Sequence, residues 1–321
     1  MNTIKRADTL RAAAALGMRK GIRSYLFLLQ IMNPISMDTA MLDYDGSIQH
    51  LDFILEPVME RFSLPAVAAL PILIGMTAGV YGAIASMAVL PLSVDHMTIV
   101  TVFVLIAHNL PQEGVIQARS GIGFVKTTLA RLAAAVLTCL AVAWCLQPAA
   151  VVGSTPVSAN GYLAVAFGAF LQSWLLDTLR LAVKILMIVV GVMLAIEVMK
   201  AFRLIDACVR LFAPFLKMMG LDRRAGLLWL TGVLFGLAYG GAVILEESRE
   251  LRLTPEEVEK LQISIGINHS MIEDPLLFLP FGINPLWLWV PRLAAAVAAV
   301  YLISAWFKLK SVFAAETSSP P

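Results

Sequence analysis

Long apolar segments constrain the fold of this chain more than any other feature of its sequence. A hydrocarbon core about 30 Å thick is crossed by roughly 20 helical residues. Because lipid offers no water to backbone amides, the chain must satisfy them within each segment, as a helix does. Six stretches approach the required length, at residues 21–41, 64–90, 124–146, 181–199, 224–245 and 287–307. We therefore expect an all-α, polytopic integral membrane protein with about six transmembrane helices.

The overall composition agrees with a lipid bilayer as the main partner. Hydrophobic residues make up 59% of the chain and charged residues only 14%, which is far from the average of soluble domains. The net charge of +2 is small and no basic patch alternates with aromatic residues, so nucleic acid is not an expected partner. A homo-oligomer is compatible with this sequence. Cys139, Cys145 and Cys208 are isolated in apolar segments and show no disulfide or zinc spacing.

Motifs of the common enzyme classes are absent from the sequence, which has no GxSxG, HExxH or phosphate-binding glycine loop. We therefore expect neither an enzyme nor a bound cofactor. The first 20 residues are basic and then apolar, which is also how a signal peptide begins. Their basic part is long, however, and no small-residue cleavage site follows it, which favours an amphipathic entry helix.

Two otherwise apolar stretches carry a histidine, acids and prolines in the same order. Residues 107–123 read AHNLPQEGVIQARSGIG, and residues 268–284 read NHSMIEDPLLFLPFGIN. Proline lacks the amide hydrogen of the helical ladder and clashes with the preceding turn, so each helix should break, at NLPQEG and at IEDP. The helices that lead into these stretches begin at N-cap signals, Ser93 and Thr254, so the two broken segments cover 93–120 and 254–282. We expect both to form re-entrant broken-helix hairpins.

The two polar stretches belong to two halves of similar sequence. His108 precedes His269 by 161 positions, and RLAAAV occurs at 131–136 and again 161 positions later at 292–297. Earlier matches are 157 positions apart, which indicates a four-residue insertion; they are Pro57 with Pro214, Gly75 with Gly232, and Gly79 with Gly236. Frequent alanine and leucine produce chance matches, but the glycine and histidine pairs favour a duplication.

The duplication suggests how the chain is divided. The predicted parts are an amphipathic entry helix at 1–20, a first repeat at 21–146, a linker with an amphipathic helix at 147–177, a second repeat at 178–310 and a disordered tail at 311–321. Three spans per repeat is an odd number, so the second repeat would be inverted relative to the first.

Charge distribution predicts the orientation. Basic residues before the first span place the N-terminus on the cytoplasmic side of a bacterial inner membrane, and an even number of spans returns the C-terminus there. Arg119 and Lys126 flank the first polar stretch, whereas Glu256, Glu257 and Glu259 begin the second. This reversal predicts that the two stretches enter the membrane from opposite faces.

Polar groups at the two breaks are the candidate site. An ionisable group at membrane depth costs about 2.5 to 3.5 kcal/mol on insertion scales, so it normally faces a cavity or a partner. Broken helices also leave unpaired backbone groups and aim their dipoles at a ligand. The expected substrate-binding residues are His108, Asn109, Gln112, Glu113, Asn268, His269, Glu273 and Asp274. The alternative is that these groups only satisfy the broken backbone.

Spacing predicts which of these groups act together. His269 and Glu273 are four residues apart, as are His108 and Gln112, so each pair would share a helix face. Two arginines about two turns into the last span of each repeat, Arg131 and Arg292, are expected to support the site. Their long side chains can reach the headgroups or pair with the acids of the broken segments, and both options stay open.

The duplicated pattern, with NHSMIEDPLLFLPFGIN as its clearest member, resembles bacterial membrane proteins of the nucleoside-recognition or Gate-domain group. That group is similar to spore maturation proteins A and B, to the membrane part of the ferrous-iron transporter B and, more distantly, to concentrative nucleoside transporters. The resemblance implies two Gate-like inverted repeats with re-entrant hairpins. These 321 residues contain neither a GTPase motif nor the cysteine-rich features of an iron transporter, so iron is not the expected substrate.

Three functions follow from this pattern. The leading expectation is a permease for a small polar solute, such as a nucleoside, bound at the midplane between the broken hairpins. The second is a membrane assembly or maturation factor of the spore-maturation type, in which the polar segments serve structure. The third is divalent-cation transport through His108, His269 and Glu273, completed by Asp274 or Glu113. It ranks lower because thiolates are missing and one acid is a glutamine in the first repeat, so no metal is assigned.

Overall fold

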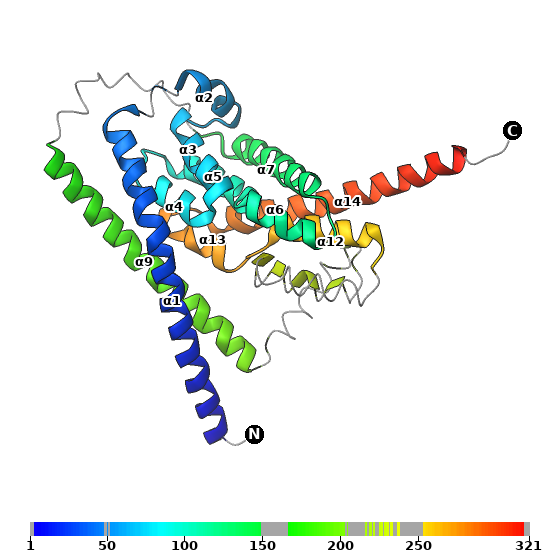
Figure 1. The fold of residues 1–321 in the computed structure, drawn as a ribbon, viewed down its shortest axis with the longest axis horizontal. Coiled ribbons are helices and arrows are strands. Elements are labelled where there is room, and N and C mark those ends of the chain that lie inside the picture. The colour runs from blue at the N-terminus through cyan, green and yellow to red at the C-terminus, as the bar shows by residue number, and fades with distance from the viewer. Residues whose placement is uncertain are drawn as a thin grey trace.

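The structure is a computed structural model that describes residues 3–47, 50, 52–148, 166–202, 204, 216, 218–219, 221, 225–226, 228–230, 232–233, 236–237 and 253–317. Every regular element among these residues is helical (Figure 1). The elements are α1 (Thr3–Tyr44), α2 (Asp52–Met59), η2 (Glu60–Phe62), η3 (Ala66–Ala68), α3 (Ala69–Ala78), α4 (Val80–Met87), α5 (Val94–Ala107), α6 (Leu110–Arg119), α7 (Phe124–Leu146), α9 (Phe167–Ala201), α12 (Pro255–Asn268), α13 (Glu273–Leu277), η4 (Leu279–Phe281) and α14 (Pro285–Thr317).

Within these ranges, four helical stretches are long and apolar enough to cross a membrane, or five if a bent pair counts as one span. The chain is therefore an all-α membrane protein, as its apolar segments predict. The predicted span at 224–245 and the acidic residues directly after it lie largely outside the described residues. So do most of the predicted linker between the halves, at 149–165, and the last four residues of the predicted tail.

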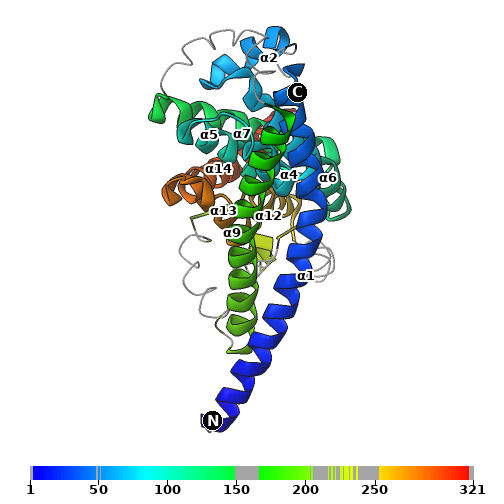
Figure 2. The same cartoon turned by 90° about the vertical axis from the view of Figure 1, so that its left-hand side faces the viewer.

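Helices α1 and α9 lie side by side at one flank of the protein (Figures 1 and 2). A Cβ built on Gly21 would lie 2.8 Å from the Cα of Val190, so the two backbones are in close contact there. Further along, the indole of Trp174 donates a hydrogen bond to the Ser36 hydroxyl over 3.1 Å. Positions rise along α1 as they fall along α9, so the two helices run antiparallel. Helix α1 continues from the predicted entry helix through residues 21–41 without a break, but these residues are not among the stretches apolar enough to cross a membrane, because arginine, asparagine and aspartate interrupt the apolar run.

The chain folds back at Gly79, where a continuous span at 64–90 was expected. Residues eight apart in a straight helix are separated by about 12 Å. A Cβ on Gly75 would nevertheless lie 3.3 Å from the Cβ of Ala83, so α3 and α4 pack against each other as a hairpin. Gly79 has φ of 88° and ψ of −176°, a conformation that is essentially restricted to glycine. The prediction of an uninterrupted span is wrong because Gly79 permits a turn inside the apolar run.

Helices α5 and α6 do not form the predicted re-entrant hairpin. The break after Ala107 is present, but the two helices together form one apolar stretch of 26 residues, Val94–Arg119, which is long enough to cross a membrane. Pro111 lies in the first turn of α6, where a missing amide hydrogen costs nothing. The proline therefore starts a second helix instead of turning the chain back.

Helices α6 and α12 also run antiparallel, although they come from different halves. The Gln117 amide donates to the backbone carbonyl of Gln262 over 2.6 Å. Glu113, four positions earlier on α6, lies 3.1 Å from His269, which is seven positions later on the other segment, so the two helices run in opposite directions. Beyond the end of α6, at the start of α7, Lys126 lies 2.5 Å from Glu259. An ion pair joins groups on one face of the protein. The prediction that these basic and acidic flanks lie on opposite membrane faces is therefore wrong, because opposite charges here attract across a packed interface.

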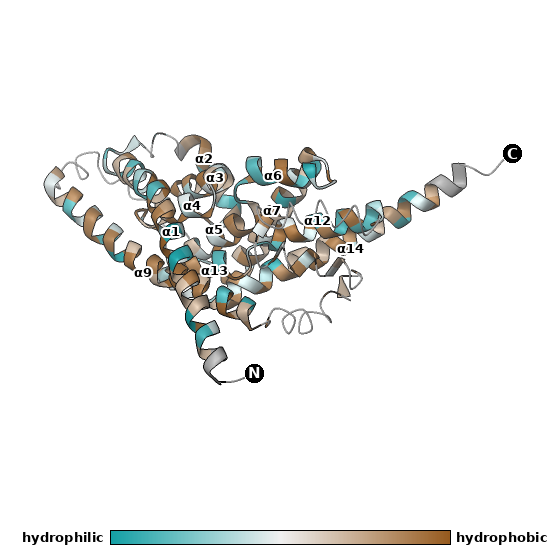
Figure 3. Cartoon of the chain, turned by 60° about the horizontal axis from the view of Figure 1, so that its bottom comes forward, coloured by the Kyte–Doolittle hydropathy of each residue, from teal (hydrophilic) through white to brown (hydrophobic). Residues whose placement is uncertain are grey.

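The candidate spans differ in how much of their length is buried inside the protein, and one of them is central. In the α5–α6 stretch 72% of the most apolar window is buried inside the protein, against 22% in α14 and 28% in α9. Apolar side chains on the peripheral helices are exposed, including Trp144, Met187 and Leu302, and brown segments recur along α9 and α14 between white and teal ones in Figure 3. Lipid can cover such surfaces. The polar site described below lies around the central span.

Helix α14 continues through residues that were expected to be disordered. It reaches Thr317, whereas the predicted tail begins at residue 311. Lysine, alanine and glutamate are good helix formers, and adding a residue to an existing helix avoids the cost of nucleation. The prediction of disorder at 311–317 is therefore wrong.

Candidate functional site

The two helix breaks follow the same backbone path. His108 and His269 come directly after the last residues of α5 and α12, with extended ψ angles of 159° and 162°. Asn109 and Ser270 come next, and both are left-handed, with φ of 48° and 50°. The sequence match at 161 positions is thus also a match in backbone geometry.

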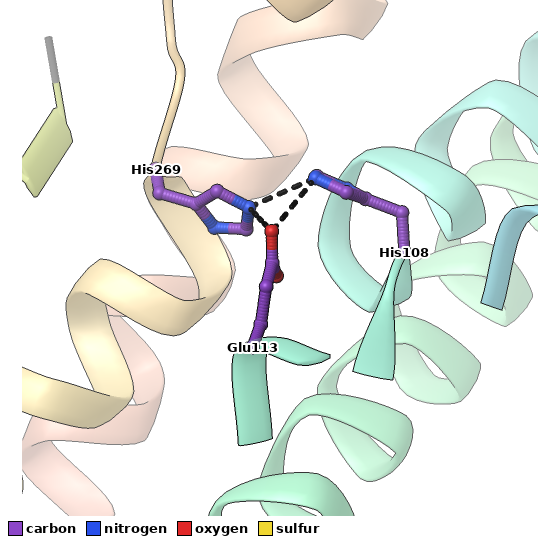
Figure 4. Close-up of side chains that lie close together, drawn as sticks. All are labelled: His108, Glu113 and His269. Atoms are coloured by element: carbon purple, nitrogen blue, oxygen red, sulfur yellow. Dashed lines mark hydrogen bonds and ion pairs between the residues drawn. The ribbon is translucent and has the colours of Figure 1, made fainter. Parts of the chain in front are cut away.

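The two histidines meet in the interior beside a carboxylate (Figure 4). The Nε2 atoms of His108 and His269 are 2.9 Å apart. Glu113 points its Oε1 atom at both rings, 3.1 Å from Nε2 of His269 and 3.4 Å from Nε2 of His108. Asp274 approaches as well, with Oδ2 3.5 Å from Nε2 of His108. All four residues are buried, with at most 7% of their surface exposed.

The remaining ring nitrogens decide which tautomer each neutral imidazole adopts. Nδ1 of His108 lies 2.9 Å from the carbonyl oxygen of Val104, and Nδ1 of His269 lies 3.0 Å from that of Gly266. A carbonyl oxygen only accepts hydrogen bonds, so each Nδ1 carries the proton. In a neutral ring, Nε2 is then an acceptor. The centre of the cluster is therefore lined by acceptor atoms.

Two buried arginines hold the carbonyl ends of the broken helices in the same way. Arg131 donates to the carbonyl oxygens of Ile106 and His108, over 3.0 and 2.8 Å. Arg292 donates to those of Ile267 and His269, over 3.2 and 2.8 Å. Both arginines are at most 1% exposed, so neither reaches the headgroup region. Each satisfies carbonyl groups that a broken helix leaves without an intrahelical partner.

The acids next to the two arginines differ in length. Arg131 forms an ion pair with Glu113, with 2.7 Å between Nη1 and Oε2. At the equivalent place in the second half the acid is Asp274, which is one methylene shorter. Among the described residues no ion pair within 4.0 Å joins it to Arg292. The two halves are therefore equivalent in backbone but not in charge pairing.

In the first half, the predicted pair of His108 and Gln112 is wrong. The helix ends at the histidine, so the four-residue spacing no longer places both side chains on one face. Gln112 is exposed and accepts a hydrogen bond from the amide of Asn109 over 3.0 Å. The next residue, Glu113, reaches the histidines instead.

In the second half, the predicted pair of His269 and Glu273 is also wrong. Glu273 does not contact His269 but accepts a hydrogen bond from the Tyr81 hydroxyl of α4 over 2.9 Å. Asp274, one residue later, faces the histidine of the other half. Tyr81 was missed in the sequence because nothing in an apolar segment distinguishes a tyrosine that bonds to the site from one that packs.

Asn268 and a set of glutamines extend the buried polar region. Asn268 is fully buried, and neither of its amide atoms has a hydrogen-bond partner among the described residues. Gln117 accepts from the Thr127 hydroxyl over 2.5 Å, and Gln262 donates to the carbonyl of Ser120 over 3.2 Å. Sequence reasoning missed these glutamines, although a glutamine in the middle of an apolar helix is a usable signal.

A separate apolar groove lies between α7 and α14. Its volume is about 540 Å³, and eight of its 17 lining residues are alanine, with Leu137, Trp287 and Leu302 among the larger ones. Polar groups contribute almost nothing to it, so it is not part of the candidate site.

Comparisons with known proteins place the chain only broadly. It is similar to an uncharacterized membrane protein of Bacillus subtilis (strain 168), YvoD, with 27% identity over 307 residues that cover 92% of this chain and 95% of that protein. No known family model matches the chain, and no solved structure matches it. A membrane location is thus supported by both the apolar helices and a relative that spans nearly the whole chain.

Proposed function

We propose that this chain is a transporter for a small polar solute, which binds near the middle of the bilayer beside His108 and His269. The observation that supports this most is the buried cluster itself. Two histidines, two acids and two arginines lie together inside a protein whose outer helices expose apolar side chains. Burying ionisable groups in a membrane protein is costly, and such groups usually mark a substrate or ion pathway.

The broken helices support the same proposal. In many secondary transporters the binding site lies where discontinuous helices of two inverted repeats meet. Here the breaks before Asn109 and Ser270 converge, and α6 and α12 run antiparallel. Movement of one half relative to the other would then open the site to each face in turn. The resemblance to nucleoside-recognition proteins favours a nucleoside-like solute, and we propose a bacterial inner membrane with both termini in the cytoplasm.

Uptake by the purified full-length protein in proteoliposomes tests this proposal. A panel of labelled nucleosides and other small polar solutes should contain at least one that is taken up. Glu113→Gln should lower that uptake at least about tenfold, because losing a hydrogen bond to a charged group costs about 1.5 to 3 kcal/mol. The neighbouring exposed residue provides a matched control, since Gln112→Ala should leave uptake unchanged. Equal uptake by the two variants would contradict the site.

A structural role in a membrane assembly or maturation factor is the second candidate. The hydrogen bonds of Arg131 and Arg292 to helix carbonyls favour it, because they serve the backbone and need no solute. Thermal unfolding with the same solute panel separates the two functions. A ligand at 100 times its Kd should stabilise a transporter by about 2.7 kcal/mol. A panel without any such shift, together with no uptake, would favour the structural role.

A further inference from the structure

Three hydrogen-bond acceptors face one another at the centre of the cluster. Both Nδ1 atoms donate to backbone carbonyls, so in neutral rings the Nε2 atoms of His108 and His269 present lone pairs to each other over 2.9 Å. Glu113 adds a carboxylate oxygen, which in its ionised form also only accepts. Three acceptors this close repel one another unless a cation lies among them. That cation is either a shared proton or a metal ion.

Distances between the three atoms suit a metal ion. The sides of the triangle are 2.9, 3.1 and 3.4 Å. An ion with tetrahedral bonds of about 2.0 to 2.1 Å to nitrogen and oxygen holds neighbouring ligand atoms about 3.3 Å apart. An ion above the plane of the triangle would therefore reach all three atoms after shifts of about 0.4 Å or less. The three residues also form a group whose ligand atoms lie within 4.8 Å of one another.

The groups behind these atoms resemble the outer shell of known metal sites. A metal-bound histidine usually donates its other ring nitrogen to a carbonyl or carboxylate, which sets the tautomer and the ring orientation. Both histidines do so here, to Val104 and Gly266. The second oxygen of Glu113 is held by Arg131 over 2.7 Å, which leaves Oε1 free to face the histidines. The site is thus oriented from both halves of the chain.

Charge balance is also favourable. Glu113 and Asp274 together carry two negative charges, which equal the charge of one divalent ion. Each arginine donates to the carbonyl end of α5 or α12, and Arg131 also pairs with the outer oxygen of Glu113. Those helix ends carry partial negative charge, which offsets part of the charge of the arginines. The two carboxylates therefore supply the negative charge that a divalent ion needs.

We propose that His108, Glu113 and His269 bind one divalent first-row transition-metal ion, with Asp274 nearby as a second negative charge. Two imidazoles with carboxylates suit zinc, cobalt, iron(II) or manganese better than magnesium or calcium, which prefer oxygen ligands. The ion joins residues of the two halves and so couples them. This site goes beyond the proposed transport function and does not depend on it, because a resident ion would bind whether or not a solute is moved.

Metal analysis of the purified full-length protein tests this site directly. After incubation with Zn²⁺ and removal of free metal, the wild type should retain about one zinc per chain. His269→Ala and Glu113→Gln should each retain at most about one tenth of that amount, since even outer-shell changes cost 10- to 100-fold in metal affinity. His96→Ala is the matched control: this histidine lies on α5 about 18 Å along the helix from His108, and its loss should leave the zinc content unchanged.

Two further measurements distinguish the loss of the metal site from misfolding of a variant. Co²⁺ should give the visible absorption of a four-coordinate nitrogen and oxygen site in the wild type and in His96→Ala only. Zn²⁺ should raise the thermal unfolding midpoint of the wild type but not that of Glu113→Gln. A wild type that retains no zinc and gives no cobalt spectrum would overturn the metal site and assign the shared cation as a proton. Equal zinc content in the wild type and His269→Ala would overturn it as well. Solute uptake by a wild type that retains no zinc and gives no cobalt spectrum would leave the proposed function standing while removing this inference.

Discussion

Lys126 at the start of α7 and Glu259 in α12 form an ion pair, with 2.5 Å between Nζ and Oε1, although they come from different halves of the chain. The pair brings the C-terminal end of α6 and the N-terminal end of α12 to one face. Because α5 and α6 form one stretch, α5 and its counterpart α12 run in opposite directions, as α1 and α9 do.

Labelling of single cysteines should place Arg119→Cys and Glu256→Cys on one face and Asp45→Cys on the other. The ion pair of Lys126 with Glu259 holds the first two sites together, and one crossing, α5–α6, separates them from Asp45. The background variant would have its three native cysteines replaced by serine. A membrane-impermeant maleimide applied to right-side-out and inverted vesicles measures the faces. Labelling of Arg119→Cys and Glu256→Cys from opposite faces would show that the antiparallel arrangement is wrong.

Gly21→Ala should destabilise the protein, by about 1 to 3 kcal/mol. Its new Cβ would lie 2.8 Å from the Cα of Val190, and a backbone atom cannot move aside as a side chain can. Gly191→Ala on the partner helix α9 is the matched control, because nothing lies within 4 Å of its Cβ position. That change should be neutral or stabilise the protein by about 0.4 to 1 kcal/mol. Thermal unfolding in detergent measures both, and equal midpoints would refute the close packing of α1 and α9.

Arg131→Met should cost more stability than Arg292→Met. Both arginines donate to two helix carbonyls, but only Arg131 also pairs with a buried acid, Glu113. Removing one partner of a buried ion pair costs about 3 to 5 kcal/mol, because the other charge is left uncompensated. The difference between the unfolding free energies of the two variants therefore reports the Glu113 pair. If Arg292→Met proves equally costly, Asp274 supports its arginine as strongly as Glu113 does.

Gly79→Ala should destabilise the hairpin of α3 and α4. With φ of 88° and ψ of −176°, this position is strained for any residue with a Cβ, at a cost of about 1 to 3 kcal/mol. Gly123→Ala is a suitable comparison, since its φ of −60° suits alanine and nothing lies within 4 Å of its Cβ position. Limited proteolysis at increasing temperature would detect the difference. A Gly79→Ala variant as resistant as Gly123→Ala would indicate that the chain does not turn at residue 79.

The all-α membrane class, both helix breaks and the spacing of the two halves can all be predicted from the amino-acid sequence. These features are local. An apolar run of about 20 residues, an N-cap at Thr254 or a proline in a first turn acts through neighbouring residues in any fold. The eight predicted site residues also include all four that meet in the cluster, His108, Glu113, His269 and Asp274.

Tertiary packing, in contrast, sets which of these groups touch and where the chain turns back. Helical periodicity paired each histidine with the residue four positions later, but the helix ends at the histidine, so the periodicity stops there. The residue five positions after each histidine reaches the cluster instead, because the left-handed backbone at Asn109 and Ser270 changes the direction of the chain. The contact of His108 with His269 joins residues 161 positions apart, and packing alone brings them together. Turning at Gly79 rather than at the prolines has the same origin: a break permits a change in direction, and the surrounding helices determine whether the chain takes it.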